Sequence, residues 1–162
     1  MINNKVSVSS IFCDPGVLIP YIYLNDKNIL KEYNIGIIPH MVDYEKVLSL
    51  IKDDDIKIIN IQDDPEKVVK EISKCKNIIS SSLHGIIISE ALNIPSAWCK
   101  FSDKVLGNGF KFKDYYLGSG RKEEDIYCSD FREKINISEV KYLPNAKYDI
   151  DGLLKSFPYH ID

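Results

Sequence analysis

The feature of this sequence that most limits its fold is a regular alternation of apolar runs and helix-like patterns over residues 35–98. Short apolar runs lie at residues 35–38, 56–61, 77–80 and 95–98. Runs of this length, bounded by proline or charged residues, are typical of buried strands. Strands that alternate with helices require a parallel sheet covered on both faces. We therefore predict an α/β fold with a Rossmann-like, doubly wound parallel sheet.

The segment after the first run has the spacing of a helix. Asp43 can cap a helix, and apolar residues follow it with the spacing i, i+3, i+4, i+7 at Tyr44, Val47, Leu48 and Ile51. The pattern predicts one helical face that packs against the sheet.

Two further helices are predicted between the later runs. Asp64 is a capping residue and Pro65 fits the first helical turn. The buried stripe of this helix is then predicted at Val68, Ile72 and Cys75. Residues 85–93 are apolar on most sides, which indicates a buried helix.

The flanking segments have less regular patterns. They predict a strand at residues 6–12, a turn at 14–16 and a short polar helix at 25–33. Residues 110–113 alternate aromatic and basic side chains, as a half-exposed strand would. A last helix is predicted at residues 145–157, with inward positions at Ile150, Leu153 and Leu154.

Composition excludes several classes of protein. The 162 residues are 44% hydrophobic and 28% charged, which is typical of a globular domain. The formal net charge of −3 argues against a nucleic-acid-binding protein. The sequence has neither an apolar run of membrane-spanning length nor the hydrophobic core of a signal peptide. We expect a cytoplasmic protein without a transmembrane segment.

No metal site is expected. Cys13, Cys75, Cys99 and Cys128 form no CxxC pair, so they are predicted to be reduced and mostly buried thiols. The acidic runs at residues 53–55 and 63–64 fit loops and helix caps better than metal ligands.

Candidate site residues come from the predicted strand ends. In open parallel sheets, ligands bind beyond the carboxyl ends of the strands. His40 follows the first strand, residues 62–63 the second and Lys100 the fourth. His160, near the last residue, is expected to be inert.

Residues 80–85, with the sequence Ser-Ser-Ser-Leu-His-Gly, join the third strand to a helix. The free backbone N–H groups and the positive dipole at a helix start bind phosphate or carboxylate, and Gly85 allows a close approach. The alternative is a serine cap beside a histidine that is hydrogen-bonded within the fold. The residues alone leave both interpretations open.

Three segments carry a resemblance to a known family. Residues 80–95, SSSLHGIIISEALNIP, closely resemble the signature of the polysaccharide pyruvyl transferase family. Residues 36–43 and 110–116 resemble pieces of the branch that makes succinoglycan-type pyruvyl ketals. The likeness runs in order from about residue 14 to residue 120. Ser82 stands where many members carry an arginine.

The resemblance implies a GT-B-like enzyme with two Rossmann-like halves and a cleft between them. This chain is similar to the C-terminal half alone. Residues 1–24 are then a linker or the end of a missing N-terminal half, and residues 25–162 are the Rossmann-like domain. Either the chain is a fragment or a truncated gene product, or the other half comes from elsewhere, as a separate polypeptide or as a second copy in a homodimer.

The implied reaction transfers a pyruvyl group from phosphoenolpyruvate to two sugar hydroxyls as a cyclic ketal, in exopolysaccharide or cell-surface polysaccharide biosynthesis. Phosphoenolpyruvate is the donor substrate, and no cofactor or metal is expected. A lipid-linked saccharide acceptor would place the enzyme at the inner membrane surface. Two alternatives remain: a GT-B glycosyltransferase that uses a nucleotide sugar, and a non-catalytic half that acts as an interaction module.

The chemistry suggests a role for each candidate residue. An imidazole can give and take protons near neutral pH, and we expect His84 to be catalytic, with the helix end keeping it neutral unless a bound anion restores its proton. For His40 two interpretations stay open: it is a site residue, or it makes a hydrogen bond within its loop. Asp43 fits the role of a helix cap better than that of a site residue. The predicted substrate-binding residues are Ser80, Ser81, Ser82, Gly85, His40, Lys100, Lys111, Lys113 and Arg121.

Overall fold

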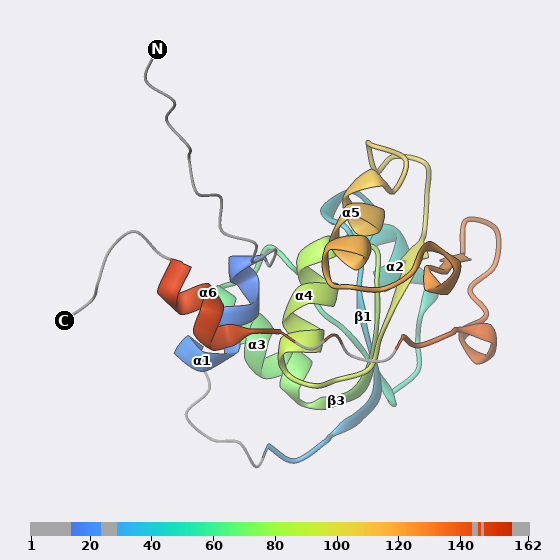
Figure 1. The fold of residues 1–162 in the computed structure, drawn as a ribbon. Coiled ribbons are helices and arrows are strands. Elements are labelled where there is room, and N and C mark those ends of the chain that lie inside the picture. Colours follow the sequence, from blue (N-terminus) through green and yellow to red (C-terminus); the bar gives the residue numbers. More distant parts are fainter. Residues whose placement is uncertain (1–13, 24–28, 144–145, 147, 157–162) are drawn as a thin grey trace.

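The computed structural model describes residues 14–23, 29–143, 146 and 148–156 (Figure 1). At its centre is a five-stranded sheet with the order β2-β1-β3-β4-β5, in which every pair of neighbouring strands is parallel. This confirms the predicted α/β class. The strands are β1 (Tyr33–Ile38), β2 (Ile56–Ile58), β3 (Cys75–Ser80), β4 (Ser96–Lys100) and β5 (Cys128–Asp130).

Helices connect the strands and cover the sheet. Those of the described residues are α1 (Ile19–Tyr23), α2 (Tyr44–Leu50), α3 (Pro65–Ser73), α4 (Leu83–Ala91), α5 (Phe110–Gly118) and α6 (Ile150–Ser156). Short 3₁₀ turns are η1 (Pro15–Leu18), η2 (Met41–Asp43), η3 (Glu123–Asp125) and η4 (Ile137–Glu139).

Both faces of the sheet are packed, as the prediction requires. Figure 1 shows α4 in front of β1 and β3, with α2 behind them. On the face of α3 and α4, Ile38 and Ile78 pack against Ile72 and Ile88. On the other face, Ile37 and Ile79 pack with Val47 of α2 and with Phe131, which follows β5. Successive side chains of a strand alternate between these two layers.

The predicted start of α3 is confirmed. The Asp64 side chain accepts hydrogen bonds from the backbone N–H groups of Glu66 and Lys67, and Pro65 is the first helical residue. Val68, Ile72 and Cys75 are buried, although Cys75 already belongs to β3.

Helix α2 is also present, but its start differs from the prediction. Val47 is buried whereas Leu48 is exposed, so the apolar face is narrower than the spacing suggests. Asp43 precedes the helix, yet its side chain makes no capping hydrogen bond. The chain instead forms η2 just before α2, and His40 caps that turn.

Several flank predictions are wrong. Residues 110–113 belong to α5, because Phe112 and Tyr116 lie one helical turn apart and pack together under Trp98 and Ile86. Residues 29–32 are not helical. In contrast, the turn predicted at residues 14–16 is present as the start of η1, which Asp14 caps.

Other flank predictions are confirmed in part or fall outside the described residues. The short edge strand β5 was not predicted. Helix α6 is shorter than expected, with Leu153 buried and Leu154 exposed. The strand predicted at residues 6–12 lies outside the described residues, as do Cys13 and His160.

Residues 14–23 pack onto the domain. Val17 is fully buried against Ile87 of α4 and Leu153 of α6. These residues therefore share a core with the sheet, whereas their assignment to the end of a first half stays a prediction. Among the described residues, no helix is long and apolar enough to cross a membrane.

Candidate functional site

The strand order creates a switch point between β1 and β3. The chain leaves β1 toward β2 on one side and leaves β3 toward β4 and β5 on the other. In doubly wound sheets, ligands bind at such a point, beyond the carboxyl ends of the two strands. His40 and Ser81 follow these two strands, and the backbone N–H of His40 donates to Ser81 Oγ at 2.8 Å. Two predicted site residues thus meet here.

Ser80 shapes the loop that follows β3. Its hydroxyl is fully buried, 2.9 Å from the carbonyl of Ile38 and 2.8 Å from that of Ser82, and it accepts from the Ser82 N–H at 3.0 Å. A Cβ on Gly85 would lie 2.4 Å from Ser80 Oγ. The glycine is therefore required for the helix to start so close to the strand.

The first turn of α4 opens at this edge of the sheet. Ser82 occupies the cap position, but its side chain makes no capping hydrogen bond. The first N–H groups of a helix have no partner within the helix, so this end is suited to an anion. His84 is the second residue of α4 and is exposed.

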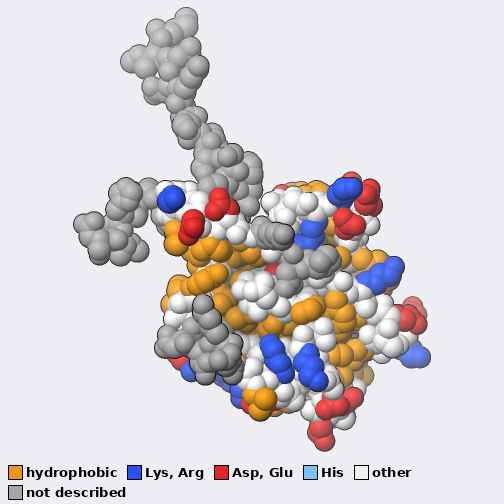
Figure 2. All heavy atoms as spheres, turned by 60° about the horizontal axis from the view of Figure 1, so that its bottom comes forward, with side chains coloured by type: hydrophobic (Ala, Val, Ile, Leu, Met, Phe, Trp, Pro, Cys, Tyr) orange, Lys and Arg blue, Asp and Glu red, His pale blue; other side chains and the backbone are white. Residues whose placement is uncertain are grey.

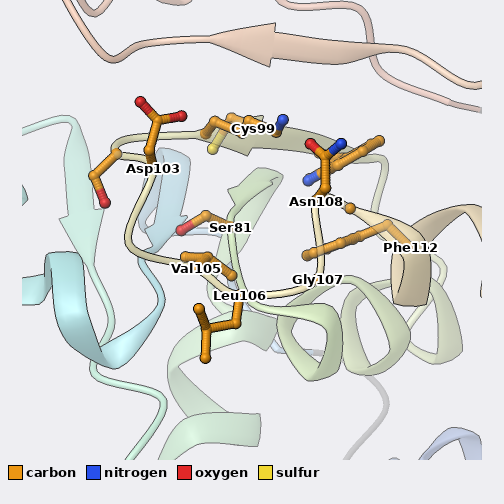
Figure 3. Close-up of a pocket in the computed structure, with 12 residues that line it drawn as sticks. Ser81, Cys99, Asp103, Val105, Leu106, Gly107, Asn108 and Phe112 are labelled. Atoms are coloured by element: carbon orange, nitrogen blue, oxygen red, sulfur yellow. The ribbon is translucent and has the colours of Figure 1, made fainter.

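A cavity of about 210 Å³ lies beside the serine loop (Figure 3). In Figure 3, Ser81 lies between the end of β4 and the loop formed by residues 102–109. Lys100, Asn108 and Phe112 also line the cavity. The site therefore combines a hydroxyl, an amide and a cation with an aromatic wall.

The loop that closes this cavity depends on glycine. Gly107, Asn108 and Gly109 have φ angles of 91°, 43° and 79°, in the left-handed region. A Cβ on Gly109 would lie 2.5 Å from Trp98 Cη2. Trp98 in turn stacks on Phe112 with ring centroids 4.7 Å apart. Backbone and aromatic rings thus fix the loop against β4.

Three of the predicted lysines lie around this edge. Lys100 ends β4 and lines both the first cavity and an adjoining one of about 360 Å³. Lys113 lines the adjoining cavity, together with Asn108 and Trp98. Lys111 lies over the ring of Phe112, with 5.6 Å from Nζ to the ring centroid. The three ammonium groups share this edge with two carboxylates, because Asp103 lines the first cavity and Glu123 lines the adjoining one.

His40 lies half-buried in a charged environment. Its Nδ1 accepts from the backbone N–H of Val42 at 3.4 Å. Burial lowers the pKa of His40, the positive charge of Lys111 lowers it further, and the Asp43 carboxylate raises it. Because the first two effects outweigh the third, the imidazole favours its neutral form.

The structure does not bring Arg121 to this edge. Its guanidinium pairs with the buried carboxylate of Glu90, with 2.8 Å between Nη2 and Oε1, and also bonds Ser119. Glu90 is near the end of α4 and bonds Ser96, the first residue of β4. The ion pair with Glu90 therefore holds Arg121 at the amino edge of the sheet.

The comparisons with known proteins identify the family. The model of the polysaccharide pyruvyl transferase family matches residues 3–102. The chain belongs to this family. The match includes two of the three segments in the predicted resemblance, residues 36–43 and 80–95, and ends before the third.

The chain is also similar to "Uncharacterized protein L143" of Acanthamoeba polyphaga mimivirus. It is 39% identical over 92 residues, which are 54% of this chain and 32% of that protein. The chain thus matches about a third of its relative's length. No solved structure matches the chain, so the GT-B-like arrangement stays a prediction.

A further cavity lies away from the switch point. It has a volume of about 580 Å³ and is lined by Tyr21, Lys31, Lys76 and Leu92, among others. Figure 2 brings the lower side of the molecule in Figure 1 forward, and apolar side chains reach the surface there. Lys31 donates to the carbonyl of Ser73, and burial lowers the pKa of Lys31. None of the predicted site residues lines this cavity.

The described residues hold no group of three or more His, Cys, Asp or Glu side chains that could bind a metal ion. Cys75 and Cys99 are buried free thiols and Cys128 is half-buried. Burial raises the pKa of Cys75 and of Cys128 to about 12. These thiols are therefore neutral and poor nucleophiles at physiological pH.

Sequence reasoning missed the loop at residues 102–109 and the wall formed by Trp98 and Phe112. The Asn108-Gly109 pair was a visible signal for a turn. The spacing of Phe112 and Tyr116 was a visible signal for a helical face. That these two features meet beside Ser81 depends on the crossover from β4 to β5.

Proposed function

We propose that this chain is the donor-binding part of a polysaccharide pyruvyl transferase and that it binds phosphoenolpyruvate at the β1–β3 switch point. The observation that carries the proposal is the open first turn of α4, bordered by Ser81, His84 and the lysines of this edge. Membership of the family supports the same assignment.

Phosphoenolpyruvate suits the electrostatics of this edge. It carries a carboxylate and a phosphate, so its site needs donors for two anionic groups. The N–H groups of α4 serve one of them. Lys100 lines the cavity next to Ser81, and Lys111 lies near enough to His40 to lower its pKa, so that ammonium groups serve the other.

The proposed reaction forms a cyclic ketal from phosphoenolpyruvate and two hydroxyls of one saccharide. The methylene carbon gains a proton, both hydroxyl oxygens bond to the neighbouring carbon, and the bond from that carbon to the phosphate oxygen breaks. One hydroxyl proton is thereby moved to carbon and the other leaves with the phosphate. His84, exposed at the start of α4, is the proposed proton carrier.

The complete reaction is proposed for an assembly larger than the described domain. The matched region covers 32% of the mimiviral relative, which supports a contribution from a further Rossmann-like half or from a second copy. The acceptor is a saccharide. A lipid-linked acceptor would place the assembly at the inner surface of a membrane.

Calorimetric titration of the chain with phosphoenolpyruvate, with uridine diphosphate in parallel, tests the proposal. We expect saturable binding of phosphoenolpyruvate that is weakened in His84→Ala and in Lys100→Ala. Lys122→Ala is the control, because Lys122 is highly exposed and pairs with Glu124 outside the cavity. Binding of uridine diphosphate alone would replace the proposal with the nucleotide-sugar glycosyltransferase.

A further inference from the structure

The side chain of Asp43 is unusual because it is buried and incompletely bonded. Asp43 is 1% exposed, and its Oδ2 has no hydrogen-bond partner among the described residues. A buried carboxylate without partners is costly, so such groups are rare unless function requires them. Some feature of this edge must account for it.

Helix capping does not account for Asp43. It stands immediately before α2, but the side chain accepts no hydrogen bond from the first turn. Its backbone N–H donates to the His40 carbonyl at 2.8 Å, which closes η2 and holds the two residues in one tight turn. The backbone therefore holds Asp43 and His40 in the same turn, and the Asp43 side chain does not cap the helix.

Charged groups from two elements act on the His40 imidazole. The negative charge of Asp43, in η2, raises the pKa of His40, and the positive charge of Lys111, in α5, lowers it. Ser81, from the loop after β3, holds the His40 backbone. The buried Cys99 thiol also lies near Asp43, and burial raises its pKa far enough to keep it uncharged.

The hydrogen bond to Val42 sets the tautomer of the neutral ring. Because Nδ1 accepts from that N–H, the single proton of a neutral imidazole lies on Nε2. This hydrogen bond is long, at 3.4 Å, and therefore weak, so its loss on protonation of Nδ1 costs little free energy. A protonated ring then needs a negative charge nearby, which Asp43 supplies.

An anion in this site would reverse the balance of charge. Without a ligand, Lys111 and burial oppose a positive charge on His40 more strongly than Asp43 favours it. A bound carboxylate or phosphate neutralises Lys111, and the attraction of Asp43 then prevails.

We infer that Asp43 is a positioning residue that stabilises a protonated His40 when an anionic donor occupies the site, so that donor binding draws a proton into the protein. The inference rests on the proposed function for the identity of the donor. It gives the site a second imidazole besides His84, one that carries positive charge when the phosphate is bound.

The first measurement is the titration of His40 by NMR in the ligand-free chain, which requires no donor. In Lys111→Met the pKa of His40 should rise, and in Asp43→Asn it should fall below that of the unmodified chain. Asp64→Asn is the control, since that carboxylate caps α3 in solvent. An unchanged His40 pKa in both test variants would overturn the inference, whatever the chain binds.

The second measurement is calorimetry with phosphoenolpyruvate in buffers of different ionisation enthalpy. Proton uptake on binding is expected for the unmodified chain and for Asp64→Asn, with loss of the uptake in Asp43→Asn. Binding with equal proton uptake in Asp43→Asn would overturn the inference and leave the proposed function intact. Absence of binding with the NMR shifts present would instead count against phosphoenolpyruvate as the donor.

Discussion

Two buried carboxylates, at opposite edges of the same sheet, have very different surroundings. Glu90, at the amino edge, is 1% exposed, and both of its oxygens accept hydrogen bonds. Its four donors are Ser96 at 3.2 Å, Arg121 at 2.8 Å, Tyr115 at 2.9 Å and Tyr148 at 2.8 Å. Asp43, at the carboxyl edge, is equally buried, and its Oδ2 has no partner among the described residues.

The difference separates a structural polar cluster from the edge at which we propose that a ligand binds. The partners of Glu90 come from α5, the loop after it, β4 and the segment before α6, so that one carboxylate ties these parts to α4. A complete network of this kind rigidifies a fold. At the carboxyl edge, the buried Oδ2 of Asp43 has no such network among the described residues.

Replacement of Glu90 should have the largest effect on stability. Glu90→Gln removes the charge that neutralises Arg121, whose side chain is only 9% exposed. The free energy of unfolding should fall by about 3–5 kcal/mol, as for other broken buried ion pairs. Urea denaturation of this variant and of Glu66→Gln measures it. Glu66 pairs with Lys70 in solvent, so the control should lose no more than about 0.5 kcal/mol. Equal losses would remove the distinction between the two edges.

A methyl group at Gly85 should damage the carboxyl edge. The Cβ of Gly85→Ala would lie 2.4 Å from Ser80 Oγ and 3.1 Å from Ile38 Cδ1. We expect a loss of about 1–3 kcal/mol in the free energy of unfolding, because the serine loop must shift. Gly118→Ala is the matched control, since a Cβ at that position would have no described atom within 4 Å. If both variants melt at the same temperature, the close contact between β3 and α4 is not required.

Alkylation of the cysteines tests how tightly the fold closes around them. Burial raises the pKa of Cys75 and of Cys128 to about 12, so both remain neutral thiols at pH 8. We expect both to react with iodoacetamide far more slowly in the folded chain than in urea, followed peptide by peptide with mass spectrometry. Fast reaction of Cys128 alone would show that the cavity beside Lys100 is open to reagents.

The smallest expected effect is a dependence of stability on pH near His40. The pKa of His40 is lowered in the folded chain, by burial first and by Lys111 second. The unfolded chain therefore binds more protons just below pH 6.5, and stability falls as the pH drops through this range. The loss should be smaller in His40→Gln and larger in Asp43→Asn, because Asp43 opposes the lowering. Thermal melts at pH 8 and pH 5.5 compare these variants with the unmodified chain. An equal loss of melting temperature in all of them would show that His40 does not cause the pH dependence.

Much of the fold follows from patterns that lie close together in the sequence. The apolar runs before His40 and Ser81 predict two strands at the centre of the sheet, and both are present. The Asp64-Pro65 pair predicts the start of α3 because a cap and a fixed φ act within one turn. Strand β5 escapes prediction because its residues, Cys128, Ser129 and Asp130, form no apolar run, unlike those of the equally short β2.

The candidate site could be predicted only in part. The strand ends already indicated His40, Ser81 and Lys100, which the structure places at one edge. Arg121 was predicted as a further cation for the anionic donor, but the structure places it at the other edge, paired with Glu90. Charge and proximity in sequence could not distinguish the two positions.

The sequence by itself determined the class of fold, the family and the segments that end at the carboxyl edge, since hydrophobic periods and caps are local. Tertiary structure alone decided which charges meet. The order β2-β1-β3 places His40 beside Ser81, and the crossover through α5 brings Lys111 to them. Asp43 is buried with its Oδ2 unpartnered among the described residues for the same reason, because its surroundings come from strands and helices that are distant along the chain.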